Sequence, residues 1–485
     1  MSGGPDGTAA ARDREEADPR RWKALTVCLV AGFMTLLDVS IVNVALPSVR
    51  TGLDASQSAL QWVVSGYALT FGLALIPAGR FGDMYGRRNA FVFGVVLFTV
   101  ASAVAGIAGD ANWLVIARLV QGVAGGVINP QVSGLIQQLF RGAERGRAFG
   151  MLGTVIGVST AIGPLLGGAL IHLGGGTDGW RLVFYVNVPI GVLAVVLAYR
   201  YIRPHEASER VRESIDPVGV LLLATGITLV LLPLVEGQEW HGAGKWALAA
   251  AGLVVLAGFA AWERRYGRHS TPVVDLALFR RRSYALGALL GTLYFAGFTA
   301  IFFVLTLYLQ NGLGYSPLEA GLTTTPFAAG SAVAAALGGR LVTRLGRPLV
   351  VAGLLLISAA LCVTALAVRL VPGEHVAWAI ALPLLAAGLG SGLVISPNQT
   401  LTLSEVPPAM GGAAGGVLQT GQRMGSALGI AAIGSVFFAE VASSGGDYAT
   451  AFRHSLLVTV AFMLVTLAVA VTDVVIDRRA RPGAS

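Results

Sequence analysis

Two segments, GRFGDMYGRR at residues 79–88 and GRLVTRLGRP at residues 339–348, each follow an apolar run and lie 260 residues apart. The segments are identical in register at four positions. These pairs are Gly79 and Gly339, Arg80 and Arg340, Gly86 and Gly346, and Arg87 and Arg347. A duplicated bundle of membrane helices produces such a pair of segments. The alternative is a chance match between two connections that are rich in glycine and arginine.

Composition indicates a membrane protein. Of the 485 residues, 55% are hydrophobic and only 12% are charged, against about 25% charged residues in a typical soluble domain. Apolar runs of about 20 residues are long enough to cross the hydrocarbon core of a bilayer as helices. Fourteen such runs are predicted, at residues 22–48, 60–82, 89–108, 113–139, 146–171, 180–200, 216–235, 246–263, 284–309, 317–341, 348–368, 378–404, 412–439 and 452–476.

Basic residues are distributed unevenly over the connections between these runs. If the N-terminus is cytoplasmic, the outer connections hold only Arg50, Lys245, Arg369 and Arg453, with Arg181 at the edge of a span. The inner connections and the two tails hold most of the remaining basic residues. The excess of basic residues on the inner side predicts an even number of spans and two cytoplasmic termini. The net charge of +8 therefore reflects topology and does not indicate nucleic-acid binding.

The predicted fold is an all-α membrane protein with fourteen transmembrane helices. Two six-helix bundles related by the repeat occupy residues 22–201 and 282–477, and residues 202–281 hold linkers and an inserted two-helix hairpin. Residues 1–21 are expected to form a disordered cytoplasmic tail, and residues 478–485 a short second one. No cleaved signal peptide is expected, because the chain begins with a polar and charged segment. Cys28 and Cys362 fall in separate spans, so packing is their expected role.

The first predicted span contains an acid, in the sequence LDVSIVNVALP at residues 37–47. An acid at bilayer depth costs at least about 2.5 kcal/mol on insertion scales and indicates a functional site. In the fourth span, Arg118, Gln121 and Asn129 recur at helical spacing and predict a polar stripe along a water-filled cavity. Asp38 and Arg118 both fall in the outer half of the bilayer, so an ion pair between them is geometrically possible. The alternative is two separate structural roles.

The fifth span carries a face of small residues in GVSTAIGPLLGG at residues 157–168. Such faces allow close approach of helix backbones, and neighbouring groups can satisfy the carbonyl that a proline leaves unpaired. Ordinary helix packing explains part of this pattern. A tight seam that seals one side of the cavity and moves is the functional interpretation. Its candidate residues are Gly157, Gly163, Pro164, Gly167 and Gly168.

The second half offers further candidates for the wall of a central cavity. Tyr294, Phe298 and Phe302 lie at helical spacing and could form an apolar wall, although packing against lipid is the competing interpretation. Polar groups come from the last spans. The complete set of candidate cavity residues is Gln121, Asn129, Tyr294, Phe298, Phe302, Asn398, Gln419 and Arg423.

Together these motifs resemble those of the major facilitator superfamily. GRFGDMYGRR looks like its loop signature, RLVQGVAGG from Arg118 like its fourth-span motif, and GVSTAIGPLLGG like the fifth-span motif of its antiporters. With LDVSIVNVALP and fourteen spans, residues 22–477 are similar to the fourteen-span drug:proton antiporters. One position departs from the pattern, because Met84 stands after Asp83 where a basic residue is usual.

The resemblance implies export of a small, amphipathic drug or natural product in exchange for protons by alternating access. It assigns proton coupling to Asp38 and Arg118, and a cytoplasmic gate to Gly79, Asp83, Gly86, Arg87 and Arg88. A proton-coupled symporter for uptake, in the same fold, remains the alternative. The absence of acids deep in the last six spans argues against a specialist for dications.

Other function classes are excluded on motif grounds. All six histidines lie in or beside connections without metal-ligand spacing, and no GxxxxGK[ST] loop is present. We therefore expect no enzyme activity, no metal and no cofactor. The expected partners are a small-molecule substrate, protons and the lipid bilayer. Arginine outnumbers lysine 32 to 2, which suggests a GC-rich bacterial genome. The protein is expected to lie in the bacterial inner membrane and to be a monomer.

Overall fold

The computed structural model describes residues 20–175, 178–204, 216–235, 244–270, 272–373 and 375–480. Nearly all of the predicted N-terminal tail lies outside these ranges. Residues 478–480 of the predicted C-terminal tail continue the last helix, and the remainder lies outside the described ranges.

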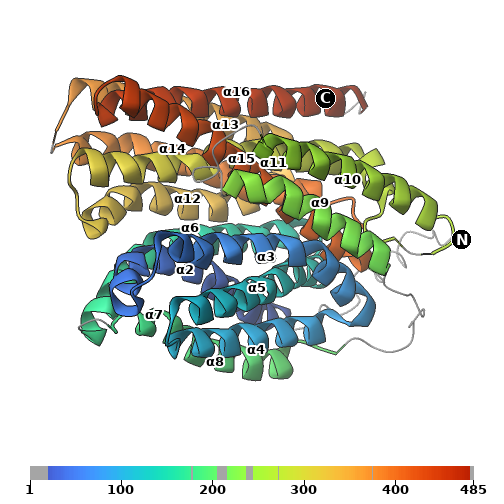
Figure 1. Ribbon diagram of the computed structural model, residues 1–485. Coiled ribbons are helices and arrows are strands. Elements are labelled where there is room, and N and C mark those ends of the chain that lie inside the picture. The colour runs from blue at the N-terminus through green and yellow to red at the C-terminus, as the bar shows by residue number, and fades with distance from the viewer. Residues whose placement is uncertain are drawn as a thin grey trace, which may run out of the picture.

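Every described element is helical, and the long helices form two layers (Figure 1). The first layer contains α2 (Arg21–Leu53), α3 (Gln57–Tyr85), α4 (Arg87–Gly106), α5 (Ala111–Leu139), α6 (Gly142–Gly174), α7 (Arg181–Tyr185) and α8 (Asn187–Tyr201). The second contains α11 (Arg282–Leu307), α12 (Pro317–Leu345), α13 (Arg347–Leu370), α14 (Val376–Thr402), α15 (Gly411–Ser443) and α16 (Tyr448–Ala480). Three short elements join these helices, η2 (Leu276–Arg280), η3 (Tyr308–Gly312) and η4 (Pro408–Met410).

Fewer helices pass a test of length and apolarity than the fourteen spans that the sequence predicts. Within the described ranges, twelve helices are long and apolar enough to cross a membrane, and α6 makes a thirteenth if its two parts, bent by 42°, count as one span. A helix occupies each of the fourteen predicted ranges, but α9 (Pro217–Val235) contributes only a shorter apolar helix. The protein is thus a multi-pass membrane protein, and its described part is all-helical, with twelve or thirteen helices that meet this test.

The sequence repeat corresponds to a repeated helix with the same ends in both layers. The hydroxyl of Ser56 accepts a hydrogen bond from the Ala59 N–H before α3, and Ser316 does the same for Glu319 before α12, 260 residues later. Such N-caps satisfy backbone donors that a helix start leaves unpaired. The two helices end at Gly86 (φ 103°) and Gly346 (φ 60°), where positive φ favours glycine. These shared glycines therefore mark equivalent turns.

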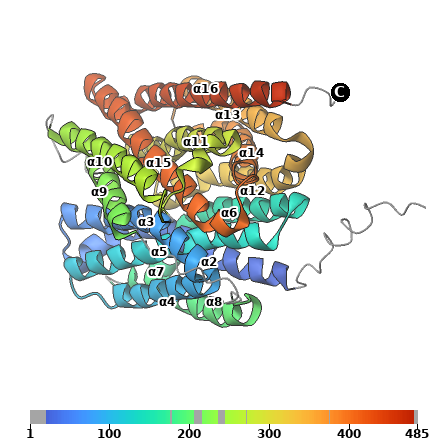
Figure 2. The ribbon, with the colours of Figure 1, turned by 90° about the vertical axis from the view of Figure 1, so that its right-hand side faces the viewer.

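Helices α9 and α10 (Gly244–Tyr266) lie beside α3 and α15 (Figure 2). Asp216 ties the two helices together, because its carboxylate accepts from the Gly219 N–H at 3.0 Å and from Trp262 Nε1 at 2.6 Å. The pair covers the junction of α3 and α15 through one apolar cluster. Its buried members are Ile76, Leu223, Ile227, Leu231, Phe259, Val273 and Val274, and Val417 and Met424 of α15 pack against it.

Candidate functional site

Asp38, in α2, is fully buried and held by three side chains. Its Oδ2 atom accepts a hydrogen bond from Arg118 Nη1 of α5 at 2.5 Å, and the two groups form an ion pair. Its Oδ1 atom accepts from Gln121 Nε2 at 2.9 Å and from Asn187 Nδ2 at 3.0 Å. Burying a charge is costly unless the charge is paired and hydrogen-bonded. The structure therefore brings together the two charges that the sequence placed at one depth.

The partners of Asp38 also bond to one another, which closes the network. Arg118 donates to Gln121 Oε1 at 2.8 Å and, through Nε, to the Val63 carbonyl at 3.0 Å. Gln121 donates in turn to Ser102 Oγ at 2.7 Å. Three helices of the first layer, α4, α5 and α8, thus contribute side chains around the carboxylate of α2. Because Arg118 has acceptors besides Asp38, its charge stays solvated by the protein if the carboxylate becomes neutral.

Sequence analysis missed Asn187 and Ser102 as members of this network. Asn187 is an amide inside the apolar segment FYVNVPIG and lies at the break between α7 and α8. A polar residue in such a segment is a signal that could have identified it. Ser102 offers no comparable signal, because serine is common in membrane helices.

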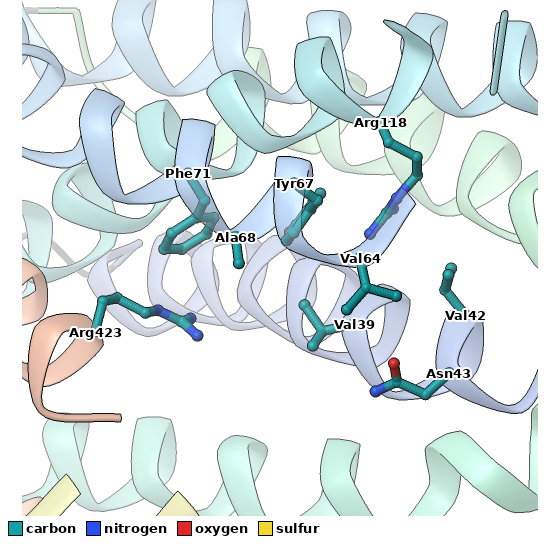
Figure 3. A pocket seen from close by; sticks show the side chains of 9 residues that line it. All are labelled: Val39, Val42, Asn43, Val64, Tyr67, Ala68, Phe71, Arg118 and Arg423. Carbon is teal, nitrogen blue, oxygen red and sulfur yellow. The ribbon is translucent and has the colours of Figure 1, made fainter. Parts of the chain in front are cut away.

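A small cavity lies between the two layers next to this network (Figure 3). Its volume is about 50 Å³, whereas pockets for drug-sized ligands measure about 300–1,000 Å³. Arg118 and Arg423 enter it from opposite ends, with Tyr67 and Phe71 between them. The complete lining is Val39, Val42, Asn43, Val64, Tyr67, Ala68, Phe71, Arg118 and Arg423. The first layer supplies every member except Arg423.

The other candidate cavity residues lie elsewhere in this conformation. Gln121 belongs to the Asp38 network, and Asn129 donates to the Gly125 carbonyl at 3.0 Å. Gln419 of α15 crosses between the layers and donates to Ser133 Oγ at 3.2 Å. Asn398 donates to the Gly287 carbonyl at 3.0 Å and so links α14 to α11. These amides bond within their own helix or to a neighbouring one, and none of them is among the residues that line the small cavity.

The predicted aromatic wall forms a cluster within the second layer. Tyr294 stacks on Phe298 with ring centroids 5.5 Å apart, and Phe298 and Phe302 both contact Phe327 of α12. The Tyr294 hydroxyl donates to Ser391 Oγ at 2.8 Å. Tyr294 is buried, and Phe298 and Phe302 are half-buried. The rings cover the interior of the second layer instead of the small cavity.

At one end of the bundle, Asp83 joins α3 to the start of α15. Its carboxylate accepts hydrogen bonds from the Gly412 and Ala413 N–H groups at 3.0 and 2.8 Å, and it pairs with Arg87 at 2.7 Å. These N–H groups belong to the first turn of α15, where donors are unpaired and negative charge is favoured. We call Asp83, Arg87 and this first turn the latch. Arg87 also donates to the Pro408 carbonyl before α15.

Two further gate candidates differ in their placement. Gly79 touches the first turn of α15 so closely that a Cβ atom there would lie 2.4 Å from the Gly412 carbonyl oxygen. Arg88 instead lies over the ring of Tyr199 in α8, at 5.4 Å, away from the latch. Met84, the departure from the expected pattern, leaves the contacts of Asp83 in place because Arg87 supplies its cationic partner.

A second junction of the two layers runs along α6 and α12 and is built from small residues. A Cβ atom on Gly146 would lie 2.5 Å from the Gly339 carbonyl oxygen, and one on Gly157 3.1 Å from that of Ala328. Thr154 adds a hydrogen bond to the Ala332 carbonyl at 3.0 Å. Only small residues permit this backbone approach.

The remaining small residues of α6 face other neighbours. Gly163 meets Ser40 of α2, Pro164 touches Gly321 of α12, and Gly168 has nothing within 4 Å. Pro164 leaves the carbonyl of Thr160 without its helical donor. The Ser40 hydroxyl donates to that carbonyl at 3.5 Å, so a neighbouring helix supplies the missing partner. The predicted seam is thus divided between two partners, α12 and α2.

Two helical layers with a cavity and buried charges between them are typical of membrane transport proteins. The family model of the Major Facilitator Superfamily matches residues 28–430. The chain is 39% identical over 444 residues to the "Probable actinorhodin transporter" of Streptomyces coelicolor, a match that covers 91% of this chain and 76% of that protein. It is 34% identical over 426 residues to the "Tetracenomycin C resistance and export protein" of Streptomyces glaucescens, covering 87% and 77%.

The solved structure of the proton:xylose symporter XylE has the same fold, with a TM-score of 0.64 at 17% identity, covering 92% of this chain and 96% of that one. At this identity the likeness concerns the fold alone. The family model and the relatives together place the chain plainly: it belongs to the Major Facilitator Superfamily and is a transporter, not an enzyme.

Proposed function

We propose that the chain exports a small amphipathic drug or natural product in exchange for protons, by alternating access of the cavity between its two layers. Relatives named for export or resistance support the efflux direction. The observation that carries the proton coupling is the buried ion pair of Asp38 and Arg118. A titratable carboxylate inside a membrane bundle is the kind of group that relays protons.

The proposed topology has fourteen spans, with α9 and α10 as an inserted hairpin between two six-helix bundles. Both termini and the latch then face the cytoplasm, and the protein acts as a monomer in the bacterial inner membrane. The distribution of basic residues supports this orientation, because the connections at the latch end hold Arg87, Arg145 and Arg203. In this orientation the described conformation is closed on the cytoplasmic side by the latch.

Asp38 is the group that we expect to take up the proton. Protonation removes its charge, which weakens the attraction between α2 and α5. Arg118 retains its bonds to Gln121 and to the Val63 carbonyl, so it does not become an isolated charge. The proton therefore changes the bond between two helices of the first layer while Arg118 keeps two other acceptors. Rocking of the layers about the cavity then exposes it to the opposite side.

The test compares the wild type with Asp38→Asn in everted membrane vesicles. The amide keeps the shape of the side chain and loses the titratable proton. With an imposed gradient, acid inside, the wild type should concentrate actinorhodin or tetracenomycin C and release protons, and the variant should do neither. Membrane abundance should remain normal, because Gln121 and Asn187 have neighbouring groups to bond.

Two results would contradict the proposal. A variant that still released protons and still concentrated the compound would remove Asp38 from the coupling. Proton-driven loss of the compound from wild-type everted vesicles would reverse the direction and indicate uptake by symport. Arg369→Gln, an exposed change at the end of α13, serves as a control for altered charge outside the cavity.

A further inference from the structure

Arg423 brings a second guanidinium into the cavity, and it comes from the opposite layer (Figure 3). It projects from α15 and lies 4.5 Å from the ring centroid of Phe71 in α3. Among the residues that the structure describes, no carboxylate forms an ion pair with it. A charge inside a membrane bundle is costly without an opposite charge, which makes Arg423 a functional residue that requires explanation.

The cavity is therefore electrostatically unbalanced. The charge of Arg118 is offset by Asp38, and no acid is among the residues that line the cavity. One positive charge remains, and it belongs to Arg423. An anion bound there would supply the missing partner.

The surface next to Arg423 is aromatic. Tyr67 and Phe71 lie one turn apart on α3, with ring centroids 5.9 Å apart. Arg118 lies 4.1 Å from the Tyr67 ring, so the two guanidinium groups cap the two ends of a pair of rings. The ring of Phe71 contacts the guanidinium of Arg423, which has no carboxylate partner among the described residues, through a cation–π interaction. An aromatic ligand can lie along the same rings while its acidic group reaches Arg423.

We propose that the transported molecule is an organic anion with an aromatic body. Its carboxylate, sulfonate or ionised phenol oxygen accepts hydrogen bonds from Arg423, whose planar group suits bidentate contact with such oxygens. Its rings lie against Tyr67 and Phe71. This proposal rests on the proposed function, because it assigns the substrate class to the same cavity.

The cavity must widen to hold such a molecule, and its construction permits that. One wall belongs to the first layer and Arg423 to the second, so separation of the layers enlarges the space between them. Among the described residues, the hydrogen bonds from α15 to the first layer come from residues 411–419, which precede Arg423. No polar bond of this kind ties Arg423 itself to the first layer, so it can move with α15.

The proposed substrate site and the proposed proton site use different residues. Asp38 lies beside Arg118 at one end of the two rings, and Arg423 lies at the other. The anion and the proton therefore do not compete for a single residue. An anion that leaves and a proton that enters both make the cell interior more positive. A membrane potential that is negative inside therefore drives the exchange together with the pH gradient.

The test measures equilibrium binding without any gradient, in nanodiscs of zwitterionic lipid. The probes are 1-anilinonaphthalene-8-sulfonate, which is an anion, and N-phenyl-1-naphthylamine, which has the same rings and no charge. Empty nanodiscs supply the background. The variants are Arg423→Gln, which removes the charge, Arg423→Lys, which retains it, and Arg369→Gln as the control outside the cavity.

We expect Arg423→Gln to weaken binding of the sulfonate by about tenfold to a hundredfold, the range for a lost hydrogen bond to a charged group. Binding of the neutral probe should change by less than about twofold, because the Arg423 charge contributes little to it. Arg423→Lys should fall between, and Arg369→Gln should match the wild type.

The proposal is overturned if the wild type does not bind the sulfonate, or if Arg423→Gln leaves the preference for the sulfonate unchanged. Equal weakening of both probes would also overturn it, because that result indicates a general role in cavity shape. If the binding experiment contradicts the role of Arg423, proton exchange by Asp38 is still tested independently by the transport experiment in everted vesicles. Conversely, an Asp38→Asn variant that still couples would refute the proton site without altering the binding result for Arg423.

Discussion

The two junctions between the layers are related by the internal repeat, and they are built differently. At one, Gly79 of α3 approaches Gly412 of α15; at the other, Gly339 of α12 approaches Gly146 of α6. Glycine contact is common to both. Only the α3–α15 junction adds a carboxylate, because Asp83 occupies the position that Thr343 occupies in the repeat. One junction therefore depends on a charge at a helix terminus, and the other on close packing with one neutral hydrogen bond, from Thr154 to the Ala332 carbonyl.

This difference indicates which junction can open. The hydrogen bonds that the first turn of α15 donates to Asp83 can break and be replaced by water at the bundle end. The α6–α12 contact continues from Gly146 to Pro164, and separation would lose close packing over this whole length. We expect α6 and α12 to remain in contact while α3 and α15 separate at the latch.

The largest expected effect tests the packed junction. Gly146→Leu would place a side chain where even a Cβ atom lies 2.5 Å from the backbone oxygen of Gly339. Overpacking of this kind costs at least about 1–3 kcal/mol, so membrane abundance and export should both be lost. Gly168→Leu in the same helix is the matched control, because nothing lies within 4 Å of that position. Equal abundance of the two variants would show that the junction is not tightly packed.

An intermediate effect is expected at the latch. Asp83→Asn removes the negative charge from the start of α15 and should lower export by about tenfold, with normal abundance. The repeat supplies the control, Thr343→Val, which should export like the wild type.

Opening of the latch can also be measured directly. Ala413 is buried against Asp83, so a cysteine at this position should react with a cytoplasmic, impermeant maleimide only when the junction separates. The background carries Cys362→Ser, because Cys362 is exposed. We expect Asp83→Asn to increase the labelling rate and Thr343→Val to leave it unchanged. Slower labelling in Asp83→Asn would contradict the assignment of Asp83 as the closing group.

The smallest effect concerns the equivalent helix starts. Ser56→Ala and Ser316→Ala each remove an N-cap, which typically costs about 1 kcal/mol. The loss should be smaller at α12, because Glu319 still accepts from the backbone N–H of residue 316 at 2.8 Å. Thermal unfolding in detergent would measure both. A larger loss for Ser316→Ala would show that this carboxylate does not compensate for the missing hydroxyl.

A second contrast between the layers concerns the equivalent helices α2 and α11. Asp38 on α2 corresponds in the repeat to Phe298 on α11, and Tyr67 on α3 corresponds to Phe327 on α12. The first layer therefore surrounds a carboxylate with polar partners, whereas the second fills the equivalent region with stacked rings. This contrast is the reason that we propose proton exchange in the first layer alone.

The positions of the helices were largely predictable from sequence. Apolar runs of about 20 residues favour membrane helices because the bilayer core offers no water to unpaired backbone groups. The repeat in the sequence also predicted two equivalent turns. Gly86 and Gly346 occur there because the backbone has a positive φ, which favours glycine. The number of fourteen spans stays a prediction, because the short apolar stretch of α9 does not by itself establish that this helix crosses the membrane.

What the tertiary structure decided is which side chains meet. Depth along a helix follows from residue count, so sequence could place Asp38 and Arg118 at similar heights. The rotation of each helix about its axis and its choice of neighbours depend on packing of the whole bundle. For this reason only the structure adds Asn187 to the Asp38 network, turns Gln121 away from the cavity, and leaves Arg423 facing it without a carboxylate.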